Sequence, residues 1–134
     1  RVSAIPETVA KLRADGYEVL VEKSAGAGAF FSDEEYAAAG ATLIDDVAEL
    51  YQKADIILKV KEPQFNTAKG IHEVDMFIDN AVLSGAGLIT VIHGKGTGVL
   101  RKSVHAYLRT HPHIKSWRLG VYGEGEDGVT IAEF

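Results

Sequence analysis

A short apolar run that passes straight into a glycine-rich loop is the feature that most constrains the fold of this 134-residue chain. The β-branched run Leu88–Ile92 is typical of a buried strand. It leads through His93 into a loop with glycine at every second position, and a helical pattern begins near Val99. A strand followed directly by a helix is the unit from which α/β sheets are built.

The rest of the chain alternates in the same way. Hydrophobic spacing and capping residues predict helices over 6–15, 32–39, 45–53, 67–83 and 99–109. Strands are predicted over 17–22, 41–44, 54–61, 88–93, 114–121 and 129–134. We therefore expect an α/β fold, with residues 1–134 forming one merged, layered domain. Its sheet is predicted to be mostly parallel, with helices on both faces and an antiparallel C-terminal strand pair.

The amino-acid composition excludes several kinds of site and function. The chain is 46% hydrophobic and 25% charged, as in ordinary globular proteins. It contains no cysteine, which excludes disulfides, thiolate metal sites and a cysteine nucleophile. No apolar run is long enough for a membrane span and no targeting signal opens the chain, so we expect a cytoplasmic protein without a membrane partner.

The charge is unevenly distributed. The net charge is −5, whereas a nucleic-acid-binding protein usually presents a basic face. Residues 93–118 nevertheless contain no acid and six basic residues. Acidic residues gather in the first half and in Glu124–Asp127. The basic stretch is either a local surface for phosphate or an ordinary solvated helix face, and charge alone leaves both open.

The loop after His93 has the character of a phosphate cradle. Free backbone N–H groups at a helix N-terminus favour an anion, and Lys95 adds a positive charge. The predicted phosphate-binding or nucleic-acid-binding residues are Gly94, Lys95, Gly96, Thr97, Gly98, Arg101 and Lys102. His93 is the candidate catalytic residue, either as a general base or as an imidazolium against the phosphate. The alternative is a strand-end histidine whose ring only bonds a backbone carbonyl.

Residues from about 66 to 134 resemble the small MutS-related (Smr) domain. The likeness rests on the 74–83 helix, His93-Gly-Lys-Gly-Thr-Gly98, Leu100-Arg-Lys-Ser-Val, and the segments 111–120 and 123–131. The resemblance implies binding and nicking of DNA or RNA.

The same resemblance exposes a gap. The family's first strand normally carries an Asp and a His implicated in cleavage, whereas Leu58-Lys-Val-Lys-Glu-Pro-Gln-Phe65 contains neither. The nearest acid is Glu62, which precedes Pro63. The phosphate-binding half of the site is therefore expected to be retained and the acidic half lost, so that binding survives without turnover.

Residues from about 1 to 63 are similar to the N-terminal region of alanine dehydrogenase and nicotinamide nucleotide transhydrogenase. The likeness rests on Arg1-Val-Ser-Ala-Ile-Pro6, the 16–22 segment, and Lys59-Val-Lys-Glu-Pro63. It implies that Arg1 and Lys61 are vestiges of a substrate-carboxylate site. The family's catalytic residues and nucleotide-binding domain fall outside the sequence, so no nicotinamide or other cofactor is expected.

Two further groups of residues carry weaker alternatives. His105, His111 and His113 are either a weak metal site or helix-end histidines, and no metal is expected. Trp117 and Tyr122 either stack on bases or belong to the core.

These two half-chain resemblances predict an engineered chimeric scaffold without an evolved activity of its own. The alternative is an Smr-like nucleic-acid-binding module with weak or no nicking activity, which would be the only credible enzymatic activity. Its partner would be nucleic acid, bound through residues 93–102. A third hypothesis is a carboxylate-binding fragment that uses Arg1 and Lys61.

Overall fold

The computed structural model describes residues 1–61, 63–66 and 71–134 and shows a mixed α/β fold. The chain divides into two compact units, residues 1–77 and 78–134, which are described separately below. Helix α4 (Glu73–Leu83) contains the boundary between them. Across the described residues, no helix has the length and apolar character needed to cross a membrane. The merging of the two units into one domain stays a prediction.

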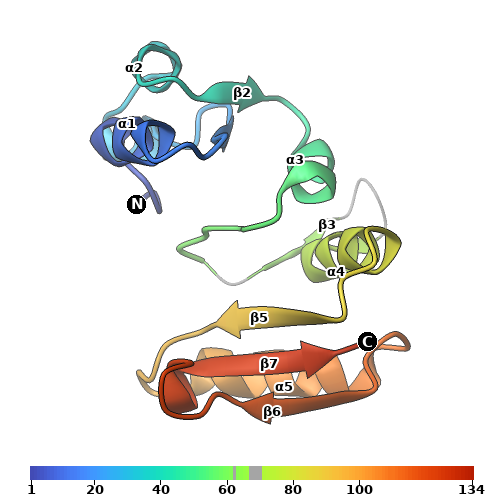
Figure 1. Ribbon diagram of the computed structural model, residues 1–134. Coiled ribbons are helices and arrows are strands. Elements are labelled where there is room, and N and C mark those ends of the chain that lie inside the picture. The colour runs from blue at the N-terminus through green and yellow to red at the C-terminus, as the bar shows by residue number, and fades with distance from the viewer. Residues whose placement is uncertain (62, 67–70) are drawn as a thin grey trace. The chain divides into compact units, whose positions relative to one another are not determined.

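The first unit follows the predicted order of helices and strands over residues 6–53 (Figure 1). Strands β1 and β2 form a parallel pair, with Leu20 opposite Thr42, and β3 and β4 form a short antiparallel pair. The elements that precede α4 are α1 (Pro6–Ala14), β1 (Leu20–Glu22), the 3₁₀ helix η1 (Ala27–Ala29), α2 (Asp33–Ala38), β2 (Thr42–Ile44), α3 (Val47–Lys53), β3 (Phe65–Asn66) and β4 (Ile71–His72).

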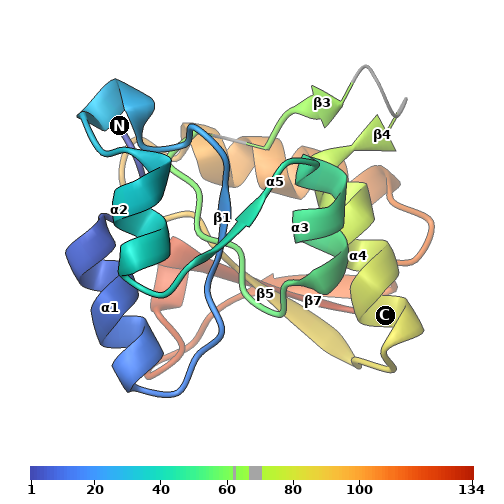
Figure 2. The same ribbon diagram turned by 90° about the horizontal axis from the view of Figure 1, so that it is seen from above.

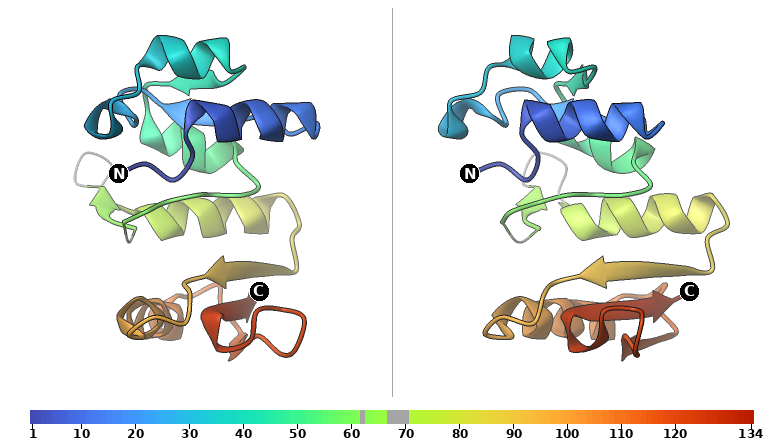
Figure 3. Two further views of the ribbon diagram at one scale, coloured as in Figure 1. Left: turned by 90° about the vertical axis from the view of Figure 1, so that its left-hand side faces the viewer. Right: turned by 60° about the vertical axis from the view of Figure 1, so that its left-hand side comes forward.

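Local signals explain where the helices of this unit begin. The Ser32 hydroxyl accepts from the backbone N–H of Glu35, and the Glu35 carboxylate accepts from the Ser32 N–H, forming the predicted capping box of α2. Helices α1 and α2 lie side by side (Figure 3). The fully buried Tyr36 of α2 donates its hydroxyl to the carbonyl of Ala4, 2.9 Å away, which ties the segment before α1 to α2.

A second group of contacts in this unit joins α3 to the start of α4 (Figure 2). Ala48 and Tyr51 of α3 are buried together with Met76 of α4. The helix predicted over 67–83 is observed from Glu73 onward, and residues 67–70 lie outside the described residues.

The predicted strand over 54–61 is wrong. This segment follows α3 without pairing to a neighbouring strand. Only Ile57 of its apolar side chains packs against the α3 core, while Ile56, Leu58 and Val60 are exposed by 69%, 58% and 49%. A run of β-branched and other apolar residues favours an extended backbone, but it becomes a sheet strand only where a partner edge is available to its backbone groups.

The second unit contains a three-stranded sheet with a helix on one of its faces (Figures 1 and 3). The strand order is β5-β7-β6, and β7 is antiparallel to both of its neighbours. The buried Leu108 anchors α5. The elements that follow α4 are β5 (Leu88–Ile92), α5 (Val99–Thr110), β6 (Ser116–Leu119), the 3₁₀ helix η2 (Glu126–Gly128) and β7 (Val129–Glu133).

The prediction of a mostly parallel, continuous sheet is also wrong. Among the described strands, only β1 and β2 pair in parallel. Strands β5 and β6 run in the same direction, as a strand–helix–strand order predicts. The chain then turns back after β6, and β7 lies between them, so that both pairings are antiparallel. The predicted C-terminal strand pair is confirmed as β6 and β7.

Candidate functional site

The loop between β5 and α5 is held at its beginning by η2 and β7. The backbone N–H groups of His93 and Gly94 both donate to the carbonyl of Gly128, at 3.0 and 2.9 Å. Gly94 and Gly98 each adopt a φ of 76°, in the left-handed region that glycine occupies without strain. Glycine therefore suits both positions, one at the start of the loop and one at the N-cap of α5.

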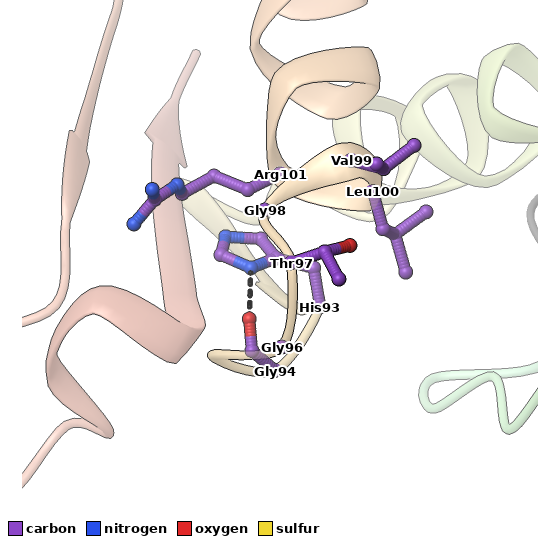
Figure 4. Close-up of a pocket in the computed structure, with 8 residues that line it drawn as sticks. All are labelled: His93, Gly94, Gly96, Thr97, Gly98, Val99, Leu100 and Arg101. Carbon is purple, nitrogen blue, oxygen red and sulfur yellow. Dashed lines mark hydrogen bonds between the residues drawn. The ribbon is translucent and has the colours of Figure 1, made fainter.

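The helix that follows begins without a side-chain cap. Gly98 is its N-cap residue, and the first turn carries no acidic residue. Within the part of the chain that the structure describes, no side chain caps its terminal N–H groups, which is the condition for binding an anion at a helix N-terminus. A pocket of about 170 Å³ lies at this point (Figure 4). It is lined by His93, Gly94, Gly96, Thr97, Gly98, Val99, Leu100 and Arg101.

The predicted cations of this site contact carboxylates of η2. Lys95 Nζ lies 2.5 Å from Glu126 Oε2 and 3.4 Å from Asp127 Oδ1. The hydrogen bond to Glu126, together with the charges of both carboxylates, raises the pKa of Lys95. Arg101 extends toward the same turn, with its Nη1 3.8 Å from Asp127 Oδ2. Lys102 is exposed on α5.

These ion pairs are at the surface and are therefore weak. The side chains of Lys95, Glu126 and Asp127 are each more than half exposed to solvent. Exposed pairs of this kind contribute at most about 1 kcal/mol each, because water and salt screen them. A phosphate could thus replace the carboxylates at little cost.

We expect the double variant Glu126→Gln, Asp127→Asn to bind nucleic acid about 3- to 10-fold more tightly at low salt. The amides keep the shape of the turn, release Lys95 and Arg101, and remove two negative charges that repel phosphate. Titration of a labelled DNA oligonucleotide measures the effect. The matched control is Glu7→Gln, Glu49→Gln, which changes the net charge equally at two exposed ion pairs of the first unit. An equal gain in both variants would contradict a local effect.

Both ring nitrogens of His93 lie within hydrogen-bond distance of an oxygen atom. Its Nδ1 lies 3.0 Å from the carbonyl oxygen of Gly94, and its Nε2 lies 2.8 Å from Thr130 Oγ1 (Figure 4 shows the first contact). His105 Nε2 lies 2.8 Å from the same hydroxyl, and the His105 ring stacks on Trp117 at a centroid distance of 4.1 Å. Burial, followed by the charges of His93 and two arginines, lowers the pKa of His105.

The other predicted candidates lie elsewhere. His111 and His113 have ring centroids 5.6 Å apart, and across the described residues no cluster of three His, Asp or Glu side chains is arranged to hold a metal. Trp117 is partly buried against His105, whereas Tyr122 is 93% exposed. Arg1 and Lys61 are both exposed and line one cavity of about 1030 Å³ in the first unit. Their role toward a carboxylate stays a prediction.

Sequence reasoning missed Thr130, Glu126 and Asp127 as parts of this site. Thr130 alternates with Val129 and Ile131 like any strand residue, so no local signal distinguishes it. The two acids did carry a signal, because they belong to the one acidic turn that follows the basic stretch 93–118.

Comparison with known families finds two overlapping matches along the chain. Residues 64–134 match the Smr domain family, and residues 1–94 match the family described as the N-terminal domain of alanine dehydrogenase/PNT. Each match covers more than half of the chain. The chain belongs to both families. The second match continues past residue 63, where the resemblance was expected to end, and overlaps the Smr match from 64 to 94.

The relatives of the Smr segment include bacterial proteins named endonuclease MutS2. The chain is 55% identical over 69 residues to endonuclease MutS2 of Brevibacillus brevis, covering 52% of this chain and 9% of that protein. It is 43% identical over 95 residues to endonuclease MutS2 of Caldicellulosiruptor bescii, covering 64% of this chain and 12% of that protein. The chain thus spans about a tenth of the length of these relatives.

A solved structure is also similar to this segment. The Smr domain of Thermus thermophilus MutS2 is 36% identical to it, with a TM-score of 0.44. The match covers 46% of this chain and 76% of that one.

The expectation of an engineered scaffold without an evolved activity is wrong. The Smr segment is about half identical to natural proteins that are named endonucleases. One of these alignments covers 64% of the chain, which is more than residues 66–134 provide, so it crosses the expected junction. The comparisons favour the alternative, an Smr-type module.

Proposed function

We propose that this protein is an Smr-type nucleic-acid-binding module that holds a backbone phosphate at the start of α5, with weak or no nicking activity. One observation carries the proposal. The pocket formed by the His93 loop and Arg101 lies inside the segment that matches the Smr family and relatives named endonucleases.

The binding step follows from the local electrostatics. The uncapped first turn of α5 offers backbone N–H groups and the positive end of the helix dipole. Lys95 and Arg101 flank it once Glu126 and Asp127 are displaced, and Lys102 adds a third exposed charge. Phosphate contacts of this kind hold nucleic acid without reading its sequence.

Weak or absent nicking follows from the acids that are available. Hydrolysis of a phosphodiester needs a group that activates the nucleophile in addition to positive charge on the phosphate. The segment 58–65 contains neither Asp nor His, and both ring nitrogens of His93 already have partners. Glu126 and Asp127 contact the cations of the site.

The test is titration of single- and double-stranded DNA with the protein at about 50 and about 200 mM salt, with supercoiled plasmid alongside to detect nicking. Two to three phosphate contacts predict an affinity that falls about 10- to 50-fold between the two conditions. Little or no relaxation of the plasmid is expected. Absence of DNA binding at the lower salt concentration, or an affinity that is the same at both salt concentrations, would contradict the proposal.

A further inference from the structure

The second unit contains a buried hydroxyl that joins two histidines from different elements. Thr130 of β7 is fully buried. Its Oγ1 lies 2.8 Å from Nε2 of His93, at the end of β5, and 2.8 Å from Nε2 of His105, on α5. The two imidazole rings are nearly perpendicular, with centroids 6.1 Å apart. Three segments that are distant in sequence therefore meet at one oxygen atom.

The chemistry of the partners sets the direction of each hydrogen bond. A backbone carbonyl only accepts, so the contact between His93 Nδ1 and the Gly94 oxygen places a proton on Nδ1. A neutral imidazole carries one N–H, and His93 Nε2 must then accept. The side chain of Thr130 can donate only its hydroxyl proton, which goes to His93. The Thr130 oxygen is left to accept from His105 Nε2–H.

We infer that Thr130 and His105 are positioning residues that hold neutral His93 as its Nδ1–H tautomer, with the Nε2 lone pair directed at Thr130. His105 keeps the Thr130 oxygen occupied as an acceptor, so that the hydroxyl proton points to His93. The His105 ring is itself supported by its stack on Trp117. The order of donation runs from His105 through Thr130 to His93 and then to Gly94.

This arrangement gives His93 a role that differs from both roles predicted from the sequence, a general base and an imidazolium against the phosphate. Its basic nitrogen is bonded to a buried hydroxyl, whereas its N–H belongs to the loop that lines the pocket. His93 therefore serves a phosphate as a hydrogen-bond donor, when a phosphate oxygen takes the place of the Gly94 carbonyl, and not as a general base. This consequence rests on the proposed phosphate site.

The first measurement is the protonation of the ring nitrogens in the wild-type chain by long-range ¹H–¹⁵N NMR, above the ordinary histidine pKa of about 6.5. We expect His93 to carry its proton on Nδ1 and His105 to carry its proton on Nε2. The opposite assignment for either ring would overturn the inference, and no variant is needed to see it.

Variants then test the positioning role. Thr130→Val keeps the shape of the side chain and removes the hydroxyl, so His93 should lose its single tautomer and the affinity for a DNA oligonucleotide should fall about 2- to 10-fold. Thr130→Ser restores a hydroxyl and should restore both the single His93 tautomer and the affinity for the DNA oligonucleotide. His105→Phe keeps a ring on Trp117 and should shift the His93 tautomer in the same direction as Thr130→Val, by a smaller amount.

Each remaining outcome has a defined meaning. An unchanged His93 tautomer in folded Thr130→Val would overturn the positioning role. A lost tautomer with unchanged DNA affinity would overturn the link between this chain of hydrogen bonds and phosphate. The expected wild-type tautomers in a protein that binds no DNA would support the positioning and overturn the proposed function instead.

Discussion

Replacing both Lys95 and Arg101 by alanine is expected to weaken DNA binding about 100-fold at about 0.1 M salt. Each cation that neutralises a phosphate releases a condensed counterion, so the loss of one contact costs roughly tenfold at this ionic strength. Lys95 alone should account for about one factor of ten. The carboxylates of Glu126 and Asp127 would remain without their partners and would repel the phosphate further.

The salt dependence separates a local contact from a general effect of charge. In the double variant, the slope of log affinity against log salt should become shallower by about 2. The matched control is Lys11→Ala, Lys53→Ala, which removes the same charge from exposed ion pairs with Glu7 and Glu49. We expect the control to change the affinity less than about twofold. Comparable losses in both variants would mean that only net charge is measured.

The second large effect is expected in the first unit, where Glu73→Ala should lower the free energy of unfolding by about 2–3 kcal/mol. Glu73 is buried at the start of α4. Its Oε2 accepts from the Tyr51 hydroxyl at 3.1 Å, the backbone N–H of Gln64 at 2.8 Å and Lys59 Nζ at 2.8 Å. The substitution removes the acceptor oxygen that these three donors share. Because Lys59 is about a third exposed to solvent, we expect less than the cost of a fully buried pair.

The pKa shifts of Glu73 and Tyr51 determine how the stability difference between wild type and Glu73→Ala changes with pH. Burial alone would raise the pKa of Glu73, but its bonds to Lys59, Gln64 and Tyr51 outweigh burial and lower it. Burial, followed by the charge of Glu73, raises the pKa of Tyr51. A carboxyl whose pKa is lowered on folding stabilises the fold above its unfolded value and loses this contribution as pH falls through the folded pKa. The difference between wild type and Glu73→Ala should therefore be full at neutral pH and shrink below about pH 4.

Denaturant unfolding followed by circular dichroism measures the difference in unfolding free energy between wild type and Glu73→Ala. Hydrogen exchange at the α3 amides shows whether the loss of stability is local to the helix that carries Tyr51. The control is Glu73→Gln, which keeps an acceptor oxygen for Tyr51 or Gln64 but removes the charge that faces Lys59. It should lie between wild type and Glu73→Ala. Equal stability of all three proteins would show that Glu73 does not hold this part of the unit together.

The features that were predicted correctly depend on residues close in sequence. The capping box of α2 needs only Ser32 and Glu35, three positions apart. The loop between β5 and α5 needs Gly94 and Gly98, whose φ of 76° glycine adopts readily. Such signals act over one or two turns of chain, and their energetics are nearly the same in any fold.

The features that were missed depend on which segments meet in space. Residues 54–61 have the composition of a strand, but they pair with no other strand in the described structure. The order β5-β7-β6 is equally hidden, because a strand–helix–strand pattern does not reveal that a later strand lies between the two. The Smr resemblance, by contrast, was recognised from ordered motifs and is confirmed by the family match.

The amino-acid sequence by itself determined the positions of most helices and strands, the family of each segment and the glycine loop with its histidine. These are properties of short windows, in which backbone preference and side-chain pattern act together. Only the tertiary structure decided that Thr130 joins His93 to His105 and that Glu126 and Asp127 contact Lys95 and Arg101. A hydrogen bond or ion pair between distant residues depends on strand order and register, which many sequences with the same local pattern leave open.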